Sequence, residues 1–221
     1  YQGEALQRRV EPLAESIGND FLLECNVLEE GSVKNAFSVI KDKWSNIDFV
    51  LHSIAFSNKD ELKGKYLDTS RNNFVDTMLI SCFSFTEVAN EASKIMNSGG
   101  SMLTLTYDGS QKYIRNYNVM GVAKAALESS VRYLAADLGE LNIRVNALSA
   151  GPMKTLAMAG ISGGKDMMKW SEKNSMLQRN INLEDVGKSG LYLLSNLSSG
   201  VTGEIHYVDS GYSKVGVPKE I

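Results

Sequence analysis

The sequence predicts a doubly wound α/β fold, in which helices cover both faces of a parallel sheet. Short apolar runs alternate along the chain with longer segments of helical periodicity. The runs are continuously apolar and do not alternate with polar residues, which indicates strands buried on both faces. The composition agrees, because 19 Gly against 3 Pro in 221 residues suits a chain with many tight strand–helix turns.

The apolar runs that end in turn residues are the expected strands, and they lie at 21–27, 49–56, 102–107, 143–150 and 204–208. Segments of helical periodicity are the expected helices, and they lie at 4–16, 32–44, 71–96, 117–138 and 182–196. Because strand and helix alternate at this spacing, the strands are expected to pair in parallel through right-handed crossovers.

Turn and capping residues set the expected helix ends. Ser32 is expected to be the N-cap of its helix, and Asn182 with Asp185 three residues later forms a capping-box pattern. Gly99 and Gly100 are expected to close the long helix that begins at residue 71. These glycines follow a helix, so they do not match a phosphate-binding turn, which follows a strand.

The composition excludes several classes of partner. With 23 basic and 26 acidic residues, the chain has no electrostatic footprint for nucleic acid. No uncharged apolar run approaches the ~20 residues of a membrane helix, and no secretory signal is visible. Cys25 and Cys82 lack metal-ligand spacing, so they are expected to be buried reduced thiols and no metal site is predicted. These features favour a cytosolic enzyme.

Ligands of a doubly wound sheet bind beyond the carboxyl ends of the strands. The segments that follow the expected strands should therefore line one edge of the sheet, and they are 25–27, 53–56, 106–107 and 150–152. His52, His206 and Asp209 lie near these ends, but we expect the histidines to be core or edge residues and the aspartate to belong to a turn.

Tyr107, Tyr117 and Lys124 are the sharpest candidates for chemistry. Tyr107 ends an expected strand, while Tyr117 and Lys124 share one helix face with about 10 Å of rise between them. A phenol beside an ammonium group can donate a hydrogen bond or a proton to a developing oxyanion. Taken alone, however, the spacing favours an ordinary amphipathic helix edge, because Tyr and Lys seven residues apart are common by chance.

Three segments resemble a known family, and they are Thr104-Leu-Thr-Tyr-Asp-Gly, Asn116-Tyr-Asn-Val-Met-Gly-Val-Ala-Lys and Arg144-Val-Asn-Ala-Leu-Ser-Ala-Gly-Pro. They look like the enoyl-acyl-carrier-protein reductases, Rossmann-like enzymes of the short-chain dehydrogenase/reductase superfamily, and the similarity covers essentially the whole chain. The spacing discriminates between branches, since Tyr117 and Lys124 match the Tyr-x6-Lys of the enoyl reductases and not the Tyr-x3-Lys of generic members.

The resemblance implies an enzyme that reduces trans-2-enoyl thioesters on acyl carrier protein with NADH, the last step of the fatty acid elongation cycle. It implies that Tyr117 hydrogen-bonds the thioester carbonyl and that Lys124 holds the nicotinamide ribose. Tyr107 matches a second tyrosine at the pocket wall, and Ser57 and Met120 would contact substrate with it. The cytoplasmic enzyme would be a homotetramer, with the 116–138 helix at an interface.

The resemblance also implies where the cofactor binds. Gln2, Asn26 and Val27 would meet the adenosine end, and a neutral Gln2 favours NADH because the 2′-phosphate of NADPH requires Arg. The other implied positions follow two strand ends, and they are Ser53, Ile54, Ala55, Ala150, Gly151, Pro152, Met153, Lys154, Thr155, Leu156 and Ala157, with Thr155 at a phosphate. Residues 153–168 would form the mobile lid over the substrate.

The chain departs from the family pattern in three places. Asn26 stands where Asp is usual, and Ala55 stands where Gly is common. The family's first strand and glycine-rich turn are not found. We therefore expect residues 1–221 to be a single domain that is N-terminally incomplete by one β-α-β unit of about 30–40 residues.

Two other functions stay open from the sequence. A generic carbonyl or ketoacyl reductase of the same superfamily is disfavoured because Gly121 stands where its Lys would be and no Ser is well placed before the Tyr. A non-catalytic Rossmann-like binding protein would have no reason to keep Tyr107, Tyr117 and Lys124 together in the crevice.

Overall fold

The computed structural model describes residues 1–219, and only the backbone of Leu156 and Ala157. Its sheet has four strands in chain order, namely β1 (Ile47–His52), β2 (Met96–Thr106), β3 (Arg144–Ala150) and β4 (Ile205–Val208). Each strand pairs in parallel with the next. The parallel sheet and four of the five expected strands are confirmed.

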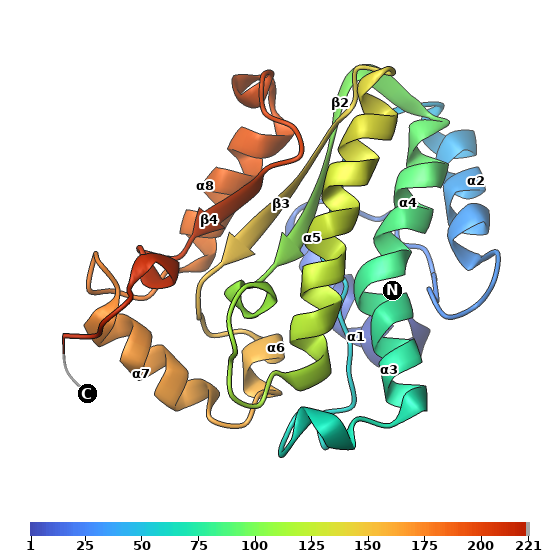
Figure 1. Cartoon of the computed structure of the whole chain (residues 1–221). Coiled ribbons are helices and arrows are strands. Elements are labelled where there is room, and N and C mark those ends of the chain that lie inside the picture. The colour runs from blue at the N-terminus through green and yellow to red at the C-terminus, as the bar shows by residue number, and fades with distance from the viewer. Residues whose placement is uncertain (220–221) are drawn as a thin grey trace.

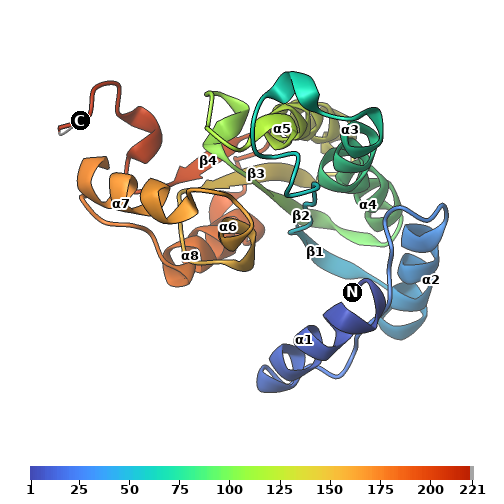
Figure 2. The same cartoon turned by 90° about the horizontal axis from the view of Figure 1, so that it is seen from below.

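Helices cover both faces of this sheet (Figures 1 and 2). The helices α4 (Ser84–Ser93) and α5 (Asn118–Gly139) lie on one face, and α8 (Leu183–Leu194) lies on the other. A further helix, α2 (Ser32–Trp44), packs against α4. In residues 1–219 no helix combines the length and the apolar character that crossing a membrane requires.

Neighbouring residues of β2 serve two separate cores. Met102 packs with Leu127 and Val131 in the core under α4 and α5. Leu103 packs with Leu148 and Leu193 in the core under α8. The doubly wound architecture is confirmed. Burial on both faces holds for β3 and for the part of β2 from Gly100 to Thr106, whereas Phe49 and Leu51 of β1 are exposed and β4 is half-buried.

The expected strand at 21–27 is wrong. After α1 (Gly3–Ser16) the chain runs without regular structure to residue 27, and its backbone bonds join Tyr1 to Leu23 and Cys25 at 2.8 and 2.7 Å. A strand needs a partner strand, and this segment pairs with none of the four. Its apolar residues pack locally instead, as Phe21 does at 5.0 Å between ring centroids from Trp44. Consequently Cys25 is only half-buried, whereas Cys82 is buried as expected, and both thiols are free.

The expected long helix at 71–96 is interrupted. It consists of α3 (Arg71–Met78), a π-helical turn (Leu79–Phe83) and α4, and β2 already begins at Met96. Gly99 and Gly100 therefore lie inside a strand and do not close the helix. In this turn the buried Ser81 hydroxyl accepts a hydrogen bond from the Phe56 N–H at 2.9 Å and donates one to the Phe56 carbonyl at 3.0 Å.

Two capping expectations have different outcomes. Ser32 is not an N-cap, because Gly31 at φ 82° precedes the helix and the Ser32 hydroxyl accepts from the Asn26 N–H at 2.9 Å. The capping box of Asn182 and Asp185 is confirmed at the start of α8.

The segment after β3 forms two helices, α6 (Leu156–Ala159) and α7 (Gly164–Asn174). Figure 1 shows them beyond the carboxyl ends of the strands. Short 3-10 turns complete the described elements, at Tyr66–Asp68, Asp108–Ser110, Asn196–Ser198 and Tyr212–Lys214.

The remaining expectations about single polar residues are confirmed. His52 is a core residue whose ring nitrogens lie 2.9 Å from the hydroxyls of Thr104 and Ser84. His206 lies in β4 at the edge of the sheet. Asp209 forms a turn, because its carboxylate accepts from two backbone N–H groups that follow it.

Candidate active site

Tyr107 and Tyr117 meet at the carboxyl end of β2. Tyr107 follows the last residue of β2, and Tyr117 is the N-cap residue of α5, which packs on β3. Their ring centroids are 5.2 Å apart and the rings cross at 74°. Lys124 follows two turns along α5 and is buried like the two rings. The structure therefore brings together the three residues that the sequence singled out.

The three side chains line a cavity of about 320 Å³, which falls in the size range of small-ligand sites. The ends of three neighbouring strands form its walls, as expected for a doubly wound sheet. The other lining residues are Ser53, Ile54, Ala55, Leu105, Thr106, Ala150, Gly151, Met153, Thr155, Met158 and Ile161.

Lys124 is anchored from below by the sheet. Its Nζ donates to the Leu105 carbonyl at 2.8 Å. An ammonium group has three donors, so two remain for the cavity that Lys124 lines. Burial lowers the pKa of Lys124 to about 8, and the nearby Cys82 and Glu128 oppose this shift. The group is therefore cationic at neutral pH, but it titrates far more readily than an exposed lysine.

Tyr117 is held between two residues of unusual backbone conformation. Asn116 and Asn118 have φ values of 61° and 31°, in the left-handed region that asparagine tolerates better than most residues. The Asn116 side chain donates to the Ser162 carbonyl at 2.8 Å, and the Asn118 side chain donates to the Glu61 carbonyl at 3.2 Å. The Tyr117 turn is thus attached to the two loops that border the cavity.

The two phenols differ in their partners. The Tyr107 hydroxyl donates to Met167 Sδ on α7 at 3.0 Å and also contacts Tyr212. Within residues 1–219, the Tyr117 hydroxyl has no hydrogen-bond partner, so it is free to bind a ligand oxygen. Burial raises the pKa of both phenols well above the usual range, which keeps them protonated and able to donate.

Several predicted cofactor and substrate positions lie outside this cavity. Gln2 and Asn26 contact each other, with Gln2 Nε2 donating to Asn26 Oδ1 at 3.0 Å, in the N-terminal segment beside the half-buried Val27. The Ser57 hydroxyl donates to Asn73 at 3.2 Å in a separate polar cluster. Met120 packs beneath the two tyrosine rings.

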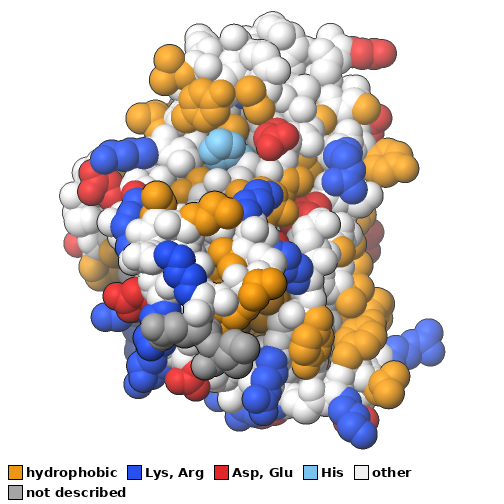
Figure 3. Space-filling view, turned by 60° about the vertical axis from the view of Figure 1, so that its left-hand side comes forward, with side chains coloured by type: hydrophobic (Ala, Val, Ile, Leu, Met, Phe, Trp, Pro, Cys, Tyr) orange, Lys and Arg blue, Asp and Glu red, His pale blue; other side chains and the backbone are white. Residues whose placement is uncertain are grey.

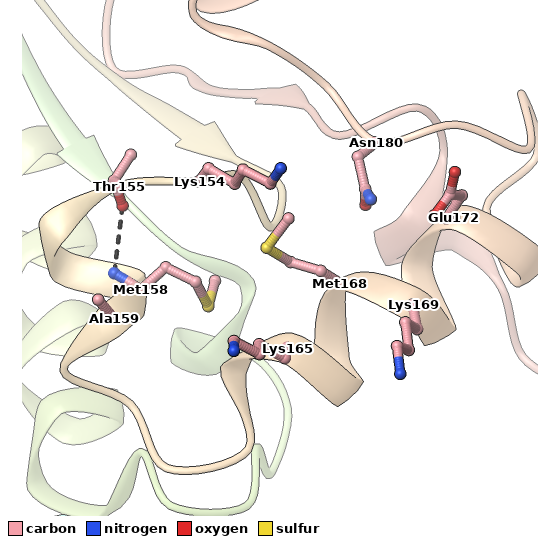
Figure 4. A pocket seen from close by; sticks show the side chains of 9 residues that line it. All are labelled: Lys154, Thr155, Met158, Ala159, Lys165, Met168, Lys169, Glu172 and Asn180. Atoms are coloured by element: carbon pink, nitrogen blue, oxygen red, sulfur yellow. Dashed lines mark hydrogen bonds between the residues drawn. The ribbon is translucent and has the colours of Figure 1, made fainter.

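A second cavity of about 640 Å³ adjoins the first, because Thr155 and Met158 line both. Figure 4 shows Lys154 reaching toward it from the turn after β3, with α6 and α7 on either side. The Thr155 hydroxyl accepts from the Met158 N–H at 3.1 Å. Pro152 is buried next to the first cavity without lining it, and the side chains of Leu156 and Ala157 lie outside the described part of the chain.

Sequence reasoning missed two residues around the site. Leu105 lines the cavity from β2, and Glu128 accepts a hydrogen bond from the cavity-lining Thr106 hydroxyl through Oε1 at 2.7 Å. Met158 and Ile161, which lie in the expected lid at 153–168, line the cavity because α6 folds over the strand ends. One signal could have identified Glu128, since it is an acidic residue on the apolar face of α5, four positions after Lys124.

Comparisons with known proteins identify the same family of relatives along nearly the whole chain. A family model described as enoyl-(acyl carrier protein) reductase matches residues 1–213. The chain is 62% identical over 218 residues to enoyl-(acyl-carrier-protein) reductase (NADH) 2 of Rhizobium meliloti (strain 1021), an alignment that covers 99% of this chain and 81% of the relative.

Solved structures give the same result. The crystal structure of FabI from Candidatus Liberibacter asiaticus superposes with a TM-score of 0.96 at 56% identity and covers 99% of this chain and 85% of that one. The Anaplasma phagocytophilum enoyl-(acyl-carrier-protein) reductase, crystallised with NAD, superposes with a TM-score of 0.94 at 52% identity and covers 99% and 84%.

Proposed function

The chain belongs to the enoyl-(acyl carrier protein) reductase family, and on this premise we propose how its residues reduce an enoyl thioester of acyl carrier protein with NADH. The reaction adds a hydride to the β-carbon and a proton to the α-carbon of the conjugated double bond. The observation that carries the proposal is the shared cavity of Tyr117 and Lys124 at the strand ends.

The residues around this cavity fit the nicotinamide end of the cofactor. The two Lys124 protons that Leu105 does not use suit the hydroxyl oxygens of a ribose. The Thr155 oxygen already accepts a backbone hydrogen bond, which leaves its own proton for a phosphate oxygen. The adenosine end would meet Gln2 and Asn26. When bound, NADH supplies the hydride.

Tyr117 is the proposed donor to the thioester oxygen. As the β-carbon gains a hydride, the electrons of the double bond move toward that oxygen and an enolate forms. A preorganised hydrogen-bond donor at this position stabilises the developing charge without reorganisation. The free hydroxyl and raised pKa of Tyr117 suit this role, because the phenol stays protonated.

Lys124 and Tyr107 complete the proposed site. The Lys124 ammonium places a positive charge near the developing enolate while it holds the ribose. Tyr107 supports the Tyr117 ring edge-to-face and forms the pocket wall toward α7. Met120 packs against both rings, and Ser57 would contact substrate as the resemblance implies.

The test follows NADH oxidation with crotonyl and acetoacetyl thioesters. We expect oxidation with the crotonyl substrate alone, and a loss of about 10²–10³ in kcat for Tyr117→Phe, the range for removing one oxyanion donor. Preference for acetoacetyl thioester would indicate a ketoacyl reductase instead. NADH binding without reduction of either thioester would indicate a binding protein.

The proposal includes a homotetramer in the cytoplasm. Exposed apolar side chains on α3, α5 and the π-helical turn between α3 and α4 support assembly through this face, and they include Phe74, Leu79, Phe83, Val122 and Tyr133. Two free thiols suit a reducing compartment. Light scattering on the full chain should give four times the mass of one copy, and the mass of a single copy would contradict the assembly.

A further inference from the structure

Glu128 is a buried carboxylate that the mechanism above does not use. It lies on the inner face of α5, one helical turn beyond Lys124, and its exposed fraction is only 2%. A carboxylate this far from water is strongly destabilising unless hydrogen bonds satisfy it. Its partners therefore indicate what it holds in place.

All three donors to Glu128 come from the segment that carries Tyr107. The Thr106 hydroxyl donates to Oε1 at 2.7 Å, and the Ser110 hydroxyl donates to the same oxygen. The Gln111 side chain donates to Oε2 at 2.7 Å. One carboxylate thus fastens both sides of Tyr107 to the helix that bears Tyr117 and Lys124.

Glu128 is also the negative charge in the surroundings of Lys124. The titratable groups around this lysine come from several elements, and they are His52 of β1, Cys82 of the π-helical turn, Tyr107 after β2, and Tyr117 and Glu128 of α5. Burial leaves the imidazole, the thiol and both phenols neutral at neutral pH. Of these groups, Glu128 is the carboxyl group, and it lies one helical turn from Lys124 on α5.

We propose that Glu128 is a positioning residue of the reduction: its carboxylate fixes Tyr107 against α5 and supplies the counter-charge of Lys124. The inference rests on the function proposed above. The Glu128 side chain then has two tasks. Its length lets the carboxylate reach the donors on either side of Tyr107, and its charge balances the Lys124 ammonium.

Two variants distinguish these tasks in the NADH and crotonyl thioester assay. Glu128→Gln keeps the length and removes the charge, so the alkaline limb of the kcat/KM profile should move down by about one pH unit. At pH 8 this shift corresponds to roughly a fivefold loss of rate. Glu128→Asp keeps the charge and shortens the reach, so kcat should fall several-fold while the limb stays in place.

Glu140→Gln is the matched control, because it removes the same charge from an exposed position at the end of α5 and should leave the profile unchanged. Gln111→Ala removes one of the donors to Glu128 at an exposed position, and it replaces Glu128→Gln as the test if that variant does not fold. We expect kcat to fall two- to threefold while the alkaline limb of the kcat/KM profile stays in place.

The outcomes are separable. A Glu128→Gln enzyme with the parent kcat and alkaline limb overturns the inference, and so does a loss of thermal stability without any kinetic change. An unchanged kcat in Gln111→Ala would contradict the proposal that the hydrogen bonds to Glu128 hold Tyr107 in place. If the parent enzyme fails to oxidise NADH with crotonyl thioester, the proposed function fails and not the role of Glu128.

Discussion

The two halves of the site are built differently. The floor, which we define as Tyr107, Tyr117, Lys124 and Glu128, is buried and belongs to the end of β2 and the inner face of α5. The cover, residues 154–174 with α6 and α7, is largely exposed and surrounds the larger cavity. Figure 3 shows charged side chains spread between apolar ones on the side of the molecule where α7 and α8 lie.

Two side-chain hydrogen bonds join the cover to the floor segment. They connect Tyr107 to Met167 and Asn116 to Ser162, at 3.0 and 2.8 Å. The floor residues Lys124 and Glu128 make four further hydrogen bonds, all to residues 105–111 at the end of β2 and just after it. The difference predicts a preorganised, rigid floor and a cover that can move at little cost to the floor.

Removing the floor lysine should have the largest effect. Lys124→Met deletes the ammonium proposed to contact the ribose and the developing enolate, so kcat/KM should fall by about 100-fold or more. Steady-state kinetics and NADH titration by fluorescence measure both losses. The same exchange at Lys188, an exposed residue of α8, should leave both values intact. Full activity of Lys124→Met would remove the lysine from the mechanism.

The pH profile of the parent enzyme tests the burial of the floor. The pKa of Lys124 lies near 8 in the folded protein, below its ordinary value of 10.5, because burial disfavours the charged form. The role proposed for Lys124 requires the charged form, so kcat/KM should be full well below pH 8 and fall about tenfold per pH unit above it. A profile that stays flat up to about pH 10 would mean that Lys124 is better solvated than the structure indicates.

Breaking one contact between floor and cover should have a smaller effect. Asn116→Gly removes the bond to Ser162 while glycine keeps the positive φ, so KM for the thioester should rise about threefold with kcat nearly unchanged. Asn142→Gly is the matched control, since Asn142 also has a positive φ and bonds Ser98 far from the cavity. If kcat falls more than KM rises, the contact belongs to the floor.

The smallest effect on activity is expected on the opposite face of the sheet. Asn182→Ala removes the capping box of α8 and should lower the free energy of unfolding by about 1 kcal/mol, as measured by urea denaturation. NADH oxidation should not change. A parallel loss of activity would show that the floor depends on both faces of the sheet.

Features that depend on a local sequence pattern could be predicted from the sequence. The alternation of strands and helices predicted the parallel sheet, and the spacing of Tyr117 and Lys124 placed them on one face of α5. Features that depend on contacts with distant segments could not be predicted from it. The run at 21–27 has the composition of a strand but no strand beside it, and the π-helical turn at Leu79–Phe83 lies in a segment that the sequence predicts as one continuous helix.

The site shows the same division. The strand-end residues of the cavity follow from the fold class, because parallel strands present their carboxyl ends at one edge. The role of Glu128 depends on burial, and the bond from Asn116 to Ser162 joins positions 46 residues apart. Neither the burial of Glu128 nor this bond could be predicted from the spacing of neighbouring residues.

The floor belongs to the part of the chain that we expect to fold early. It belongs to the β2–α5–β3 unit, whose crossover spans 107–143 and is shorter than those at 53–95 and 151–204. Shorter closures lose less chain entropy and tend to form earlier. We expect this unit to be structured in the folding transition state, so that substitutions in the floor slow refolding, whereas substitutions in the cover mainly accelerate unfolding.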